Sequence, residues 1–372
     1  MDSSIKFGSI RGIEIGINYT WLIVFVLVTA SLALAFFPQV VAGLGTVEYW
    51  ILGASASILL FGSVLVHELS HSIVAQQLGI GVKSITLFIF GGVSNIQGEP
   101  KSPRDELLIA AAGPGASIGI GLVLVGLWYA TLGLSAPISA ILGYLWVVNF
   151  LLAAFNLIPG FPLDGGRVFR AIVWRVTGDF ERSTRIAANV GRGVGYLFIF
   201  GGLFIVFLGD IIAGLWLAFI GWFLTSAAEQ SYRQVAYQIG LQKIKASQMM
   251  NPNPVVVGPD VTLQELVDEY VLRRNVRAIP VVEDGNIVGL VTLSDVRPVP
   301  REAWGSTRVR QVMTPEGQLK TADPRDGLDK VLKQISEQDL NQLPVVEGHK
   351  LVGLLSRSQI IRYMQLREEL RG

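Results

Sequence analysis

The chain of 372 residues contains no cysteine and only three histidines. The lack of cysteine excludes disulfide bonds and any metal site or nucleophile built on a thiolate. Charged residues are also scarce, at 16% of the chain against roughly 25% in an average soluble domain. The net charge of +1 gives no indication of nucleic-acid binding. Apolar residues predominate instead, since 51% of the chain is hydrophobic and its mean hydropathy is +0.50.

The N-terminus lacks the features of a cleaved signal peptide. Residues 1–18 carry four charged side chains, and Ile13, Ile15 and Ile17 alternate with polar or small residues. This alternation predicts a short interfacial strand that pairs with Lys6–Ile10 as a hairpin. The apolar run that follows has no small-residue cleavage pattern and is therefore expected to be a retained membrane span.

Six long apolar runs with few or no charges predict six transmembrane helices, because roughly 20 such residues cross a bilayer. These runs are Tyr19–Phe37, Trp50 to near Gly79, about 107–132, about 138–158, Gly193–Gly209 and Ile211–Ala228. Val82–Gln97 is too short and irregular for a span, and its partial alternation indicates a strand or hairpin. An arginine-rich loop is expected at Arg167–Arg185, with its side chains at lipid headgroups.

The distribution of lysine and arginine predicts the orientation of the spans. The turns at 38–48, 133–137 and 209–210 contain no Lys or Arg, whereas the arginines from Arg167 to Arg192 fall on the opposite side. Cytoplasmic loops of membrane proteins carry the excess of positive charge. The chain is therefore expected to be a multi-pass protein of the cell membrane, with its N-terminus and everything after the sixth span in the cytoplasm.

The second span contains His67-Glu68-Leu69-Ser70-His71, an H-E-x-x-H sequence. On an α-helix His67 and His71 lie one turn apart on the same face, where two imidazoles can bind one Zn²⁺ and Glu68 can act as general base. A chance H-E-x-x-H is rarer in an apolar run than in a soluble chain, because ionisable groups inside a bilayer are costly. About 11 helical residues, or roughly 16 Å, remain before Gly79, which places the pair in the cytoplasmic half of the helix.

A catalytic zinc site usually has three protein ligands and one open position, so a third ligand is required. The remaining histidine, His349, lies far along the chain and is interpreted as a solvated turn residue. The candidate is Asp164, which follows the fourth span at the same depth as the histidines. Pro159 and Pro162 precede it and break the helix, so its carboxylate can turn inward. The plainer interpretation of Asp164 is a simple helix-end residue.

These residues suit the hydrolysis of a peptide bond. Zn²⁺ lowers the pKa of its bound water towards about 7, and Glu68 is expected to take the proton and return it to the leaving amine. The Asn156 amide can hydrogen-bond the substrate backbone or the developing oxyanion, or it can serve only as a structural cap. The strand near Phe88–Asn95 can pair with an unwound substrate segment by β-strand addition.

The pattern resembles the site-2 protease family of intramembrane zinc metalloproteases. Two family motifs occur in the right order on the right spans, H-E-x-x-H at 67–71 and N-x-x-P followed by D-G at 156–165, and Gly113-Pro114 in the third span is also similar. The resemblance covers about residues 1–230. It implies one Zn²⁺ per chain held by His67, His71 and Asp164, and it implies a single-span, membrane-anchored regulator as the substrate, cut within its transmembrane segment.

After residue 232 the chain becomes more polar and contains an internal repeat. Met250-Asn-Pro recurs 63 residues later as Met313-Thr-Pro, and Pro280-Val-Val recurs 64 residues later as Pro344-Val-Val. Each copy is typical of an amphipathic helix, a strand, a Gly turn, a second strand and a final helix. Since neither copy easily buries its apolar face alone, the two copies are expected to pack on each other.

The two copies resemble a tandem pair of cystathionine-β-synthase (CBS) domains. Such pairs often bind adenine nucleotides and often form dimers, so the resemblance implies a nucleotide as a second ligand and makes a homodimer plausible. The first copy contains Thr292-Leu-Ser-Asp295, in which Thr292 and Asp295 would bind the nucleotide and Asp295 would hold its ribose; a purely structural Asp295 is the alternative. The second copy has Gln359 in place of the acid.

The expected architecture is a polytopic α-helical membrane domain at 1–232, with six spans and short β-hairpins at its cytoplasmic side. A linker at 233–245 follows, and then a soluble α/β pair of CBS domains at 246–300 and 308–367.

The expected function is that of an intramembrane zinc endopeptidase that acts in the bilayer and is modulated through its CBS pair. One alternative is a CBS-regulated membrane transporter or channel, against which the uncharged stretch from Leu107 to Leu163 argues. The other is a catalytically silent membrane scaffold, against which the complete set of His67, Glu68, His71 and Asp164 argues.

Overall fold

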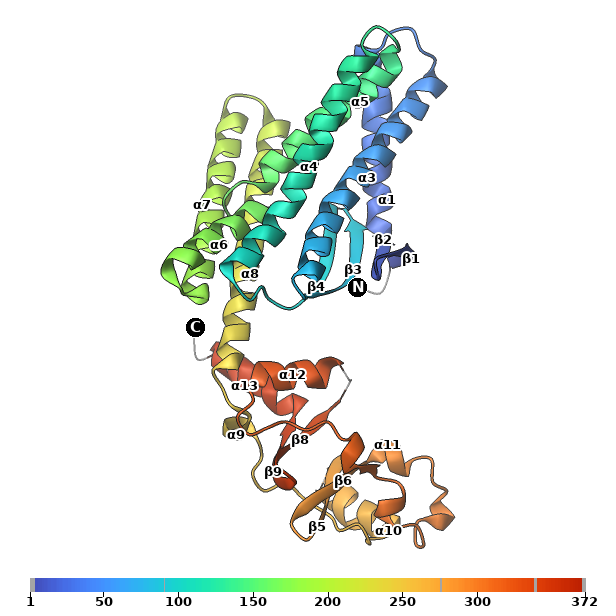
Figure 1. The fold of residues 1–372 in the computed structure, drawn as a ribbon, viewed down its shortest axis with the longest axis vertical. Coiled ribbons are helices and arrows are strands. Elements are labelled where there is room, and N and C mark those ends of the chain that lie inside the picture. The colour runs from blue at the N-terminus through green and yellow to red at the C-terminus, as the bar shows by residue number, and fades with distance from the viewer. Residues whose placement is uncertain (1–3, 90, 275, 338–339, 370–372) are drawn as a thin grey trace. The chain divides into compact units, whose positions relative to one another are not determined.

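The computed structural model of the protein describes residues 4–89, 91–274, 276–337 and 340–369, in two units, Met1–Val235 and Ala236–Gly372 (Figure 1). The first unit contains β1 (Ser4–Ile10), β2 (Ile13–Asn18), α1 (Tyr19–Ser31), α2 (Phe37–Val40), α3 (Thr46–Gln77), β3 (Gly81–Phe88), β4 (Gly91–Gln97), α4 (Pro103–Thr131), α5 (Ala136–Asn156), α6 (Asp164–Thr177), α7 (Phe180–Phe207) and most of α8 (Ile211–Gln242). The second unit contains α9 (Ala246–Met249), α10 (Leu263–Glu265), β5 (Ala278–Glu283), β6 (Asn286–Thr292), α11 (Leu293–Val296), β7 (Thr314–Pro315), α12 (Leu328–Glu337), β8 (Gln342–Glu347), β9 (Lys350–Ser356) and α13 (Arg357–Glu369).

Six helical segments of the described chain are long and apolar enough to cross a membrane, which confirms the expected number of spans. They are Tyr19–Val40, Thr46–Gln77, Pro103–Thr131, Ala136–Asn156, Phe180–Phe207 and Ile211–Gln242. The first of them joins α1 to α2 through a π-helical segment at Leu32–Phe36. The last, α8, extends to Gln242 and so runs into the predicted linker at 233–245. The boundaries proposed for the linker and the CBS domains stay predictions.

The arginine-rich segment was expected to be a loop, and this prediction was wrong. It forms α6 and the start of α7. Arginine is a good helix former, and α6 ends at Gly178, whose φ of 69° is the left-handed conformation that glycine readily adopts at a helix C-terminus. The α7 helix begins at Phe180 because Asp179 caps it, accepting a hydrogen bond from the Arg182 N–H at 2.9 Å.

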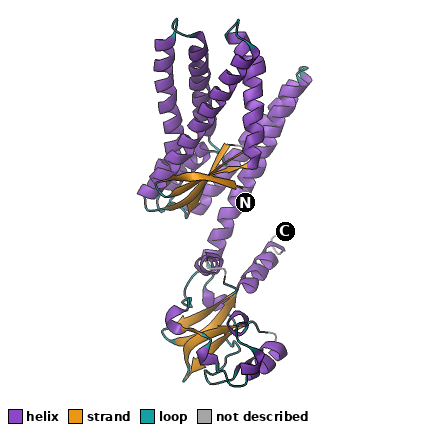
Figure 2. Cartoon of the chain, turned by 90° about the vertical axis from the view of Figure 1, so that its right-hand side faces the viewer, coloured by secondary structure: helices purple, strands orange, loops and turns teal. Residues whose placement is uncertain are grey.

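Both expected hairpins are present, and they join into one sheet of order β1-β2-β3-β4. The β2 and β3 strands pair in parallel, with Ile15 opposite Ile85, and the outer pairs are antiparallel. Buried side chains of this sheet, among them Ile13 and Ile85, pack on Ala75 of α3 and Ile109 of α4. Figure 2 shows the sheet at one end of the long helices. The β4 strand is at the edge of the sheet and contacts α3.

The second unit consists of two copies of one hairpin-containing repeat, and each copy pairs with a segment of the other. This confirms that the two copies pack on each other. The hairpins β5–β6 and β8–β9 have the same register, since Pro280 lies opposite Leu290 and Pro344 lies opposite Leu354. The segment that leads each copy pairs with the other copy's sheet. Asn251 exchanges backbone hydrogen bonds of 2.9 and 3.0 Å with Leu354, and β7 pairs with β6.

Candidate metal centre

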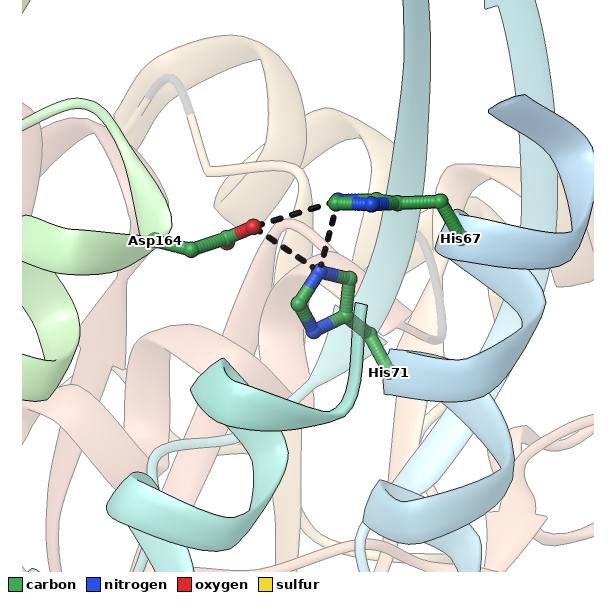
Figure 3. A group of neighbouring side chains, drawn as sticks. All are labelled: His67, His71 and Asp164. Atoms are coloured by element: carbon green, nitrogen blue, oxygen red, sulfur yellow. Dashed lines mark hydrogen bonds and ion pairs between the residues drawn. The ribbon is translucent and has the colours of Figure 1, made fainter. Parts of the chain in front are cut away.

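His67 and His71 project from α3 towards Asp164, the first residue of α6 (Figure 3). The two imidazole Nε2 atoms lie 3.2 Å apart, and Asp164 Oδ2 lies 3.2 Å from His67 Nε2 and 3.1 Å from His71 Nε2. Among the described residues these three side chains form a group that can hold a metal ion. Ligand atoms at about 2.0–2.1 Å from a tetrahedral zinc ion are about 3.3 Å from one another. The triangle therefore has the size of one face of a zinc coordination shell.

The third span, α4, orients both imidazole rings through contacts to their Nδ1 atoms, the nitrogens that do not face Asp164. His71 Nδ1 lies 2.6 Å from the carbonyl oxygen of Ile109, which can only accept, so this nitrogen carries the proton and Nε2 is left for the centre. His67 Nδ1 lies 2.9 Å from Ser117 Oγ. Such outer partners fix the tautomer and the direction of a metal-binding histidine. The donor set therefore fits a zinc ion in its contacts as well as in its size.

The Asp164 carboxylate supplies the negative charge of the donor set. Its Oδ2 faces the two Nε2 atoms at 3.2 and 3.1 Å, and a carboxylate binds a metal as the anion. It therefore complements a divalent cation at the centre of the triangle.

Gly113 is the point where α4 passes closest to the rings. A Cβ placed on Gly113 would collide with Nε2 of both His67 and His71. Glycine is therefore required for α4 to approach the metal-binding atoms of the histidines. The sequence indicated only that this residue resembles the family pattern, because nothing local in a Gly-rich span reveals what faces it.

Glu68 is held by the edge strand β4. Its Oε2 accepts a hydrogen bond of 2.9 Å from Ser94 Oγ, and Ser72 Oγ donates in turn to Ser94 Oγ at 3.2 Å. A Cβ on Gly92, the second residue of β4, would collide with the Glu68 side chain. Nothing in the sequence pointed to Ser94. The alternation within Val82–Gln97 predicted a strand, but it did not indicate that this strand would lie against Glu68.

A cavity of about 270 Å³ contains these groups, and Glu68, Asn156 and Asp164 all line it. The Asn156 Nδ2 donates to the Leu152 carbonyl at 3.0 Å, which uses one of its two N–H groups. Arg167 also lines the cavity and is the only arginine or lysine among the described lining residues. Arg167 therefore faces the cavity that also contains Glu68, whereas the sequence predicted a contact with lipid headgroups.

Removal of the Ser94 hydroxyl is expected to slow catalysis without removing the metal. Ser94→Ala should lower kcat by about 10- to 100-fold, the usual effect of one hydrogen bond to a charged group, with KM and zinc content unchanged. Ser94→Thr keeps the hydroxyl and should keep most of the activity. Ser70→Ala is the matched control, because among the described residues the Ser70 hydroxyl donates to Val66 O of its own helix and not to Glu68. Equal kcat values for Ser94→Ala and Ser70→Ala would contradict the role of Ser94.

In the second unit a cleft of about 900 Å³ is lined by both copies of the repeat, with Arg277 and Thr292 from the first and Arg357 from the second. Asp295 Oδ2 accepts hydrogen bonds from Thr292 N and Oγ1 at 2.8 and 2.7 Å, as an N-terminal cap of α11. Gln359 accepts the equivalent bond from Ser356 N at 2.9 Å, so the change from acid to amide preserves the cap. Nucleotide binding by Thr292 and Asp295 stays a prediction.

Comparison with known proteins agrees with this architecture. The profile of Peptidase family M50 matches residues 55–136 and 133–202, and the CBS domain profile matches 246–300 and 309–366. The chain is 34% identical to the zinc metalloprotease MJ0392 of Methanocaldococcus jannaschii over 100% of both chains. It is 36% identical to sll0528 of Synechocystis sp., over 98% of this chain and 96% of that protein, and 34% identical to Rip3 of Mycobacterium tuberculosis, over 98% and 94%; both are provisionally named zinc metalloproteases.

A solved structure of a site-2 protease from Methanocaldococcus jannaschii is 34% identical and covers 62% of this chain and 95% of that one, with a TM-score of 0.43.

The fold and the site define a multi-pass membrane enzyme with a zinc-type donor set. The chain belongs to peptidase family M50, the site-2 protease family, and is a zinc metalloprotease with a C-terminal pair of CBS domains.

Proposed function

We propose that this metalloprotease cleaves a peptide bond within the transmembrane segment of a single-span, membrane-anchored regulatory protein. The observation that supports this most directly is the position of His67 and His71 inside α3, a helix that is long and apolar enough to span the membrane. A scissile bond must reach that depth to meet them. Regulated release of the anchored factor follows from such a cut.

His67, His71 and Asp164 would hold a zinc ion, which supplies the Lewis acidity that activates water and polarises a peptide carbonyl. Glu68 removes a proton from the attacking water as the oxygen bonds to the carbonyl carbon, and it delivers that proton to the nitrogen as the C–N bond breaks. Ser94 keeps the Glu68 carboxylate in place during both transfers. The Asn156 amide lines the same cavity and would donate to the carbonyl oxygen as charge develops there.

The substrate helix must unwind before any of its carbonyls can reach this cavity, because helical peptide groups are engaged in their own hydrogen bonds. An extended substrate segment can add to β4, the edge strand of the described sheet, whose Ser94 bonds to Glu68. The segment predicted for this role was Phe88–Asn95; Phe90 lies outside the described residues. Backbone pairing of this kind binds many sequences, which suits a protease that reads conformation more than side chains.

Mapping the cut tests this proposal. The protein and a single-span substrate are reconstituted together in lipid vesicles, and the product termini are determined by mass spectrometry. The new termini are expected inside the apolar segment of the substrate, with cleavage stopped by a zinc chelator. Cuts confined to the soluble flanks of the substrate would show that the enzyme is not an intramembrane protease.

We also propose that the enzyme resides in the cell membrane with its N-terminus and CBS pair in the cytoplasm. The turns that would face outward, at 38–48, 133–137 and 209–210, contain no Lys or Arg. Labelling of single cysteines introduced at positions 134 and 284 in intact cells checks this orientation. Only the cysteine at position 134 should react with a membrane-impermeant reagent, and the opposite pattern would reverse the topology.

The CBS pair is proposed to modulate cleavage by binding an adenine nucleotide in the cleft that contains Thr292, where Arg277 and Arg357 line the same cleft and would contact the phosphates. Nucleotide titration should raise the thermal stability of the protein and change its kcat at least about twofold. Arg357→Ala should weaken both responses. Unchanged stability and unchanged cleavage across the titration would remove this regulatory role.

We also propose that two chains form a homodimer through their CBS pairs. Sedimentation analysis of the purified protein tests this.

A further inference from the structure

Glu106 and Arg170 form an ion pair in the interior of the membrane unit, where Glu106 is 0% and Arg170 is 3% exposed. Arg170 Nε donates to Glu106 Oε1 at 2.6 Å, and Nη2 pairs with the same oxygen. The guanidinium carbon lies 5.0 Å from the centre of the Phe161 ring and 4.5 Å from that of Phe180, and Nη1 lies 3.4 Å from Thr184 Oγ1. Arg170 was expected at lipid headgroups, and this prediction was wrong because its partner is far away in the sequence.

The pair connects α4, which holds the histidine rings, with α6, which carries the third ligand. Glu106 is on α4, one turn before Ile109, whose carbonyl holds the His71 ring. Arg170 is on α6, which begins at the ligand Asp164. The histidines come from α3, and their rings are held by Ile109 and Ser117 of α4. The position of α6 relative to α4 therefore decides whether Asp164 Oδ2 meets the two Nε2 atoms.

The start of α6 is wedged against the loop that precedes it. A Cβ on Gly165 would collide with the backbone of Leu157 and Ile158, and one on Gly166 with the backbone of Gly160 and Phe161. Backbone contact of this kind fixes a pivot but leaves the helix free to rock about it. A second anchor further along α6 is needed to fix its direction, and Arg170 lies almost two turns beyond Asp164.

Stability alone does not account for the pair. A buried ion pair loses so much hydration that well-packed apolar residues of similar volume are often equally stable or more so. Two charges retained in an apolar interior are better explained by the geometry they impose, because the planar guanidinium fixes direction as well as distance. Arg170 contacts α4, α7 and the loop at Phe161 at once, which an apolar side chain cannot do with comparable directionality.

We propose that Glu106 and Arg170 are positioning residues for the zinc ligand Asp164: their ion pair locks α6 against α4 so that the three ligand atoms stay at zinc-binding distances. This inference depends on the zinc site proposed above. It concerns how the site is assembled, and it gives neither residue contact with metal or substrate.

The decisive variant is the double substitution Glu106→Met, Arg170→Met, because single substitutions leave one unpaired buried charge and can fail to fold. The double variant should unfold at a temperature equal to or above that of the wild type. It should bind zinc about 10- to 100-fold more weakly in competition with a chelator, as is usual when an outer support of a metal ligand is lost. Its kcat should fall at limiting zinc, with KM for the substrate unchanged and activity rescued by excess zinc.

Arg175→Met is the matched control, since Arg175 is exposed near the end of the same helix. Arg170→Lys is the second test, because it keeps the charge and the fold but loses the planar fork, and it should also weaken zinc binding about tenfold. Wild-type zinc affinity in a folded double variant or in Arg170→Lys would overturn the inference. If the wild-type chain binds no zinc at these residues, the proposed zinc site is wrong. If the wild type binds zinc and the variants bind it with the same affinity, the zinc site stands and only the positioning role is wrong.

Discussion

Glu68→Gln is expected to abolish proteolysis while leaving zinc bound. The amide has the size of the carboxylate and its oxygen can still accept the Ser94 hydrogen bond, so the cavity keeps its shape. It cannot accept the proton of the attacking water or return one to the leaving nitrogen. Loss of a general base costs about 10² to 10⁴ in rate, and we expect a reduction in kcat of at least about 10³ because Glu68 serves both transfers.

The control for this substitution is Glu48→Gln, on the same helix. The Glu48 side chain caps the start of α3 by accepting from the Gly45 N–H at 2.6 Å, and an amide oxygen can do the same. Cleavage by Glu48→Gln should equal that of the wild type. Persistent cleavage by the Glu68 variant would show that another group is the base. Loss of zinc from it would mean that Glu68 is itself a ligand.

Gly113→Ala is expected to destroy the metal centre with a single methyl group. The added carbon would occupy the space of His71 Nε2 and press on His67 Nε2, the two atoms that face the centre. The rings must turn away, which also breaks their bonds to Ile109 and Ser117 on the same helix. Zinc content should fall below about a tenth of the wild-type value, since outer contacts alone are worth 10- to 100-fold in metal affinity, and cleavage should fall with it.

Gly115→Ala separates this effect from a general change in α4. A Cβ on Gly115 would meet no atom of another described element within 4 Å, and alanine improves helix propensity by about 1 kcal/mol. This variant should therefore retain zinc and activity and unfold at a similar or higher temperature. Equal zinc content in the two alanine variants would mean that the histidine rings do not face α4 as described.

The parts of the site that follow from local pattern were predictable. His67 and His71 share a face because an α-helix repeats every 3.6 residues, and six spans follow from runs of apolar residues. Asp164 was identified because few acidic residues lie at that depth after the fourth span. The two hairpins were also predictable, since the alternation around Ile13–Ile17 and within Val82–Gln97 is the signature of half-buried strands.

The supporting contacts were not predictable, because each joins residues that are distant in the chain. Ser94 reaches Glu68 across 26 residues, and Ser117 reaches His67 across 50. Arg170 was misassigned for the same reason: an arginine-rich segment favours headgroup contacts on average, and only the fold brings Glu106 to it across 64 residues. Helix α6 was missed because a short amphipathic helix contains no long apolar run.

In the proposed mechanism, one zinc ion held by His67, His71 and Asp164 is required for catalysis. Elemental analysis of purified protein, after brief exposure to a weak chelator, tests this three-ligand site most directly. The wild type and Glu68→Gln should each contain one zinc per chain, and His67→Ala, His71→Ala and Asp164→Ala should each contain almost none while remaining folded. A full zinc complement in Asp164→Ala, or no zinc in the wild type after loading with Zn²⁺, would contradict the three-ligand site.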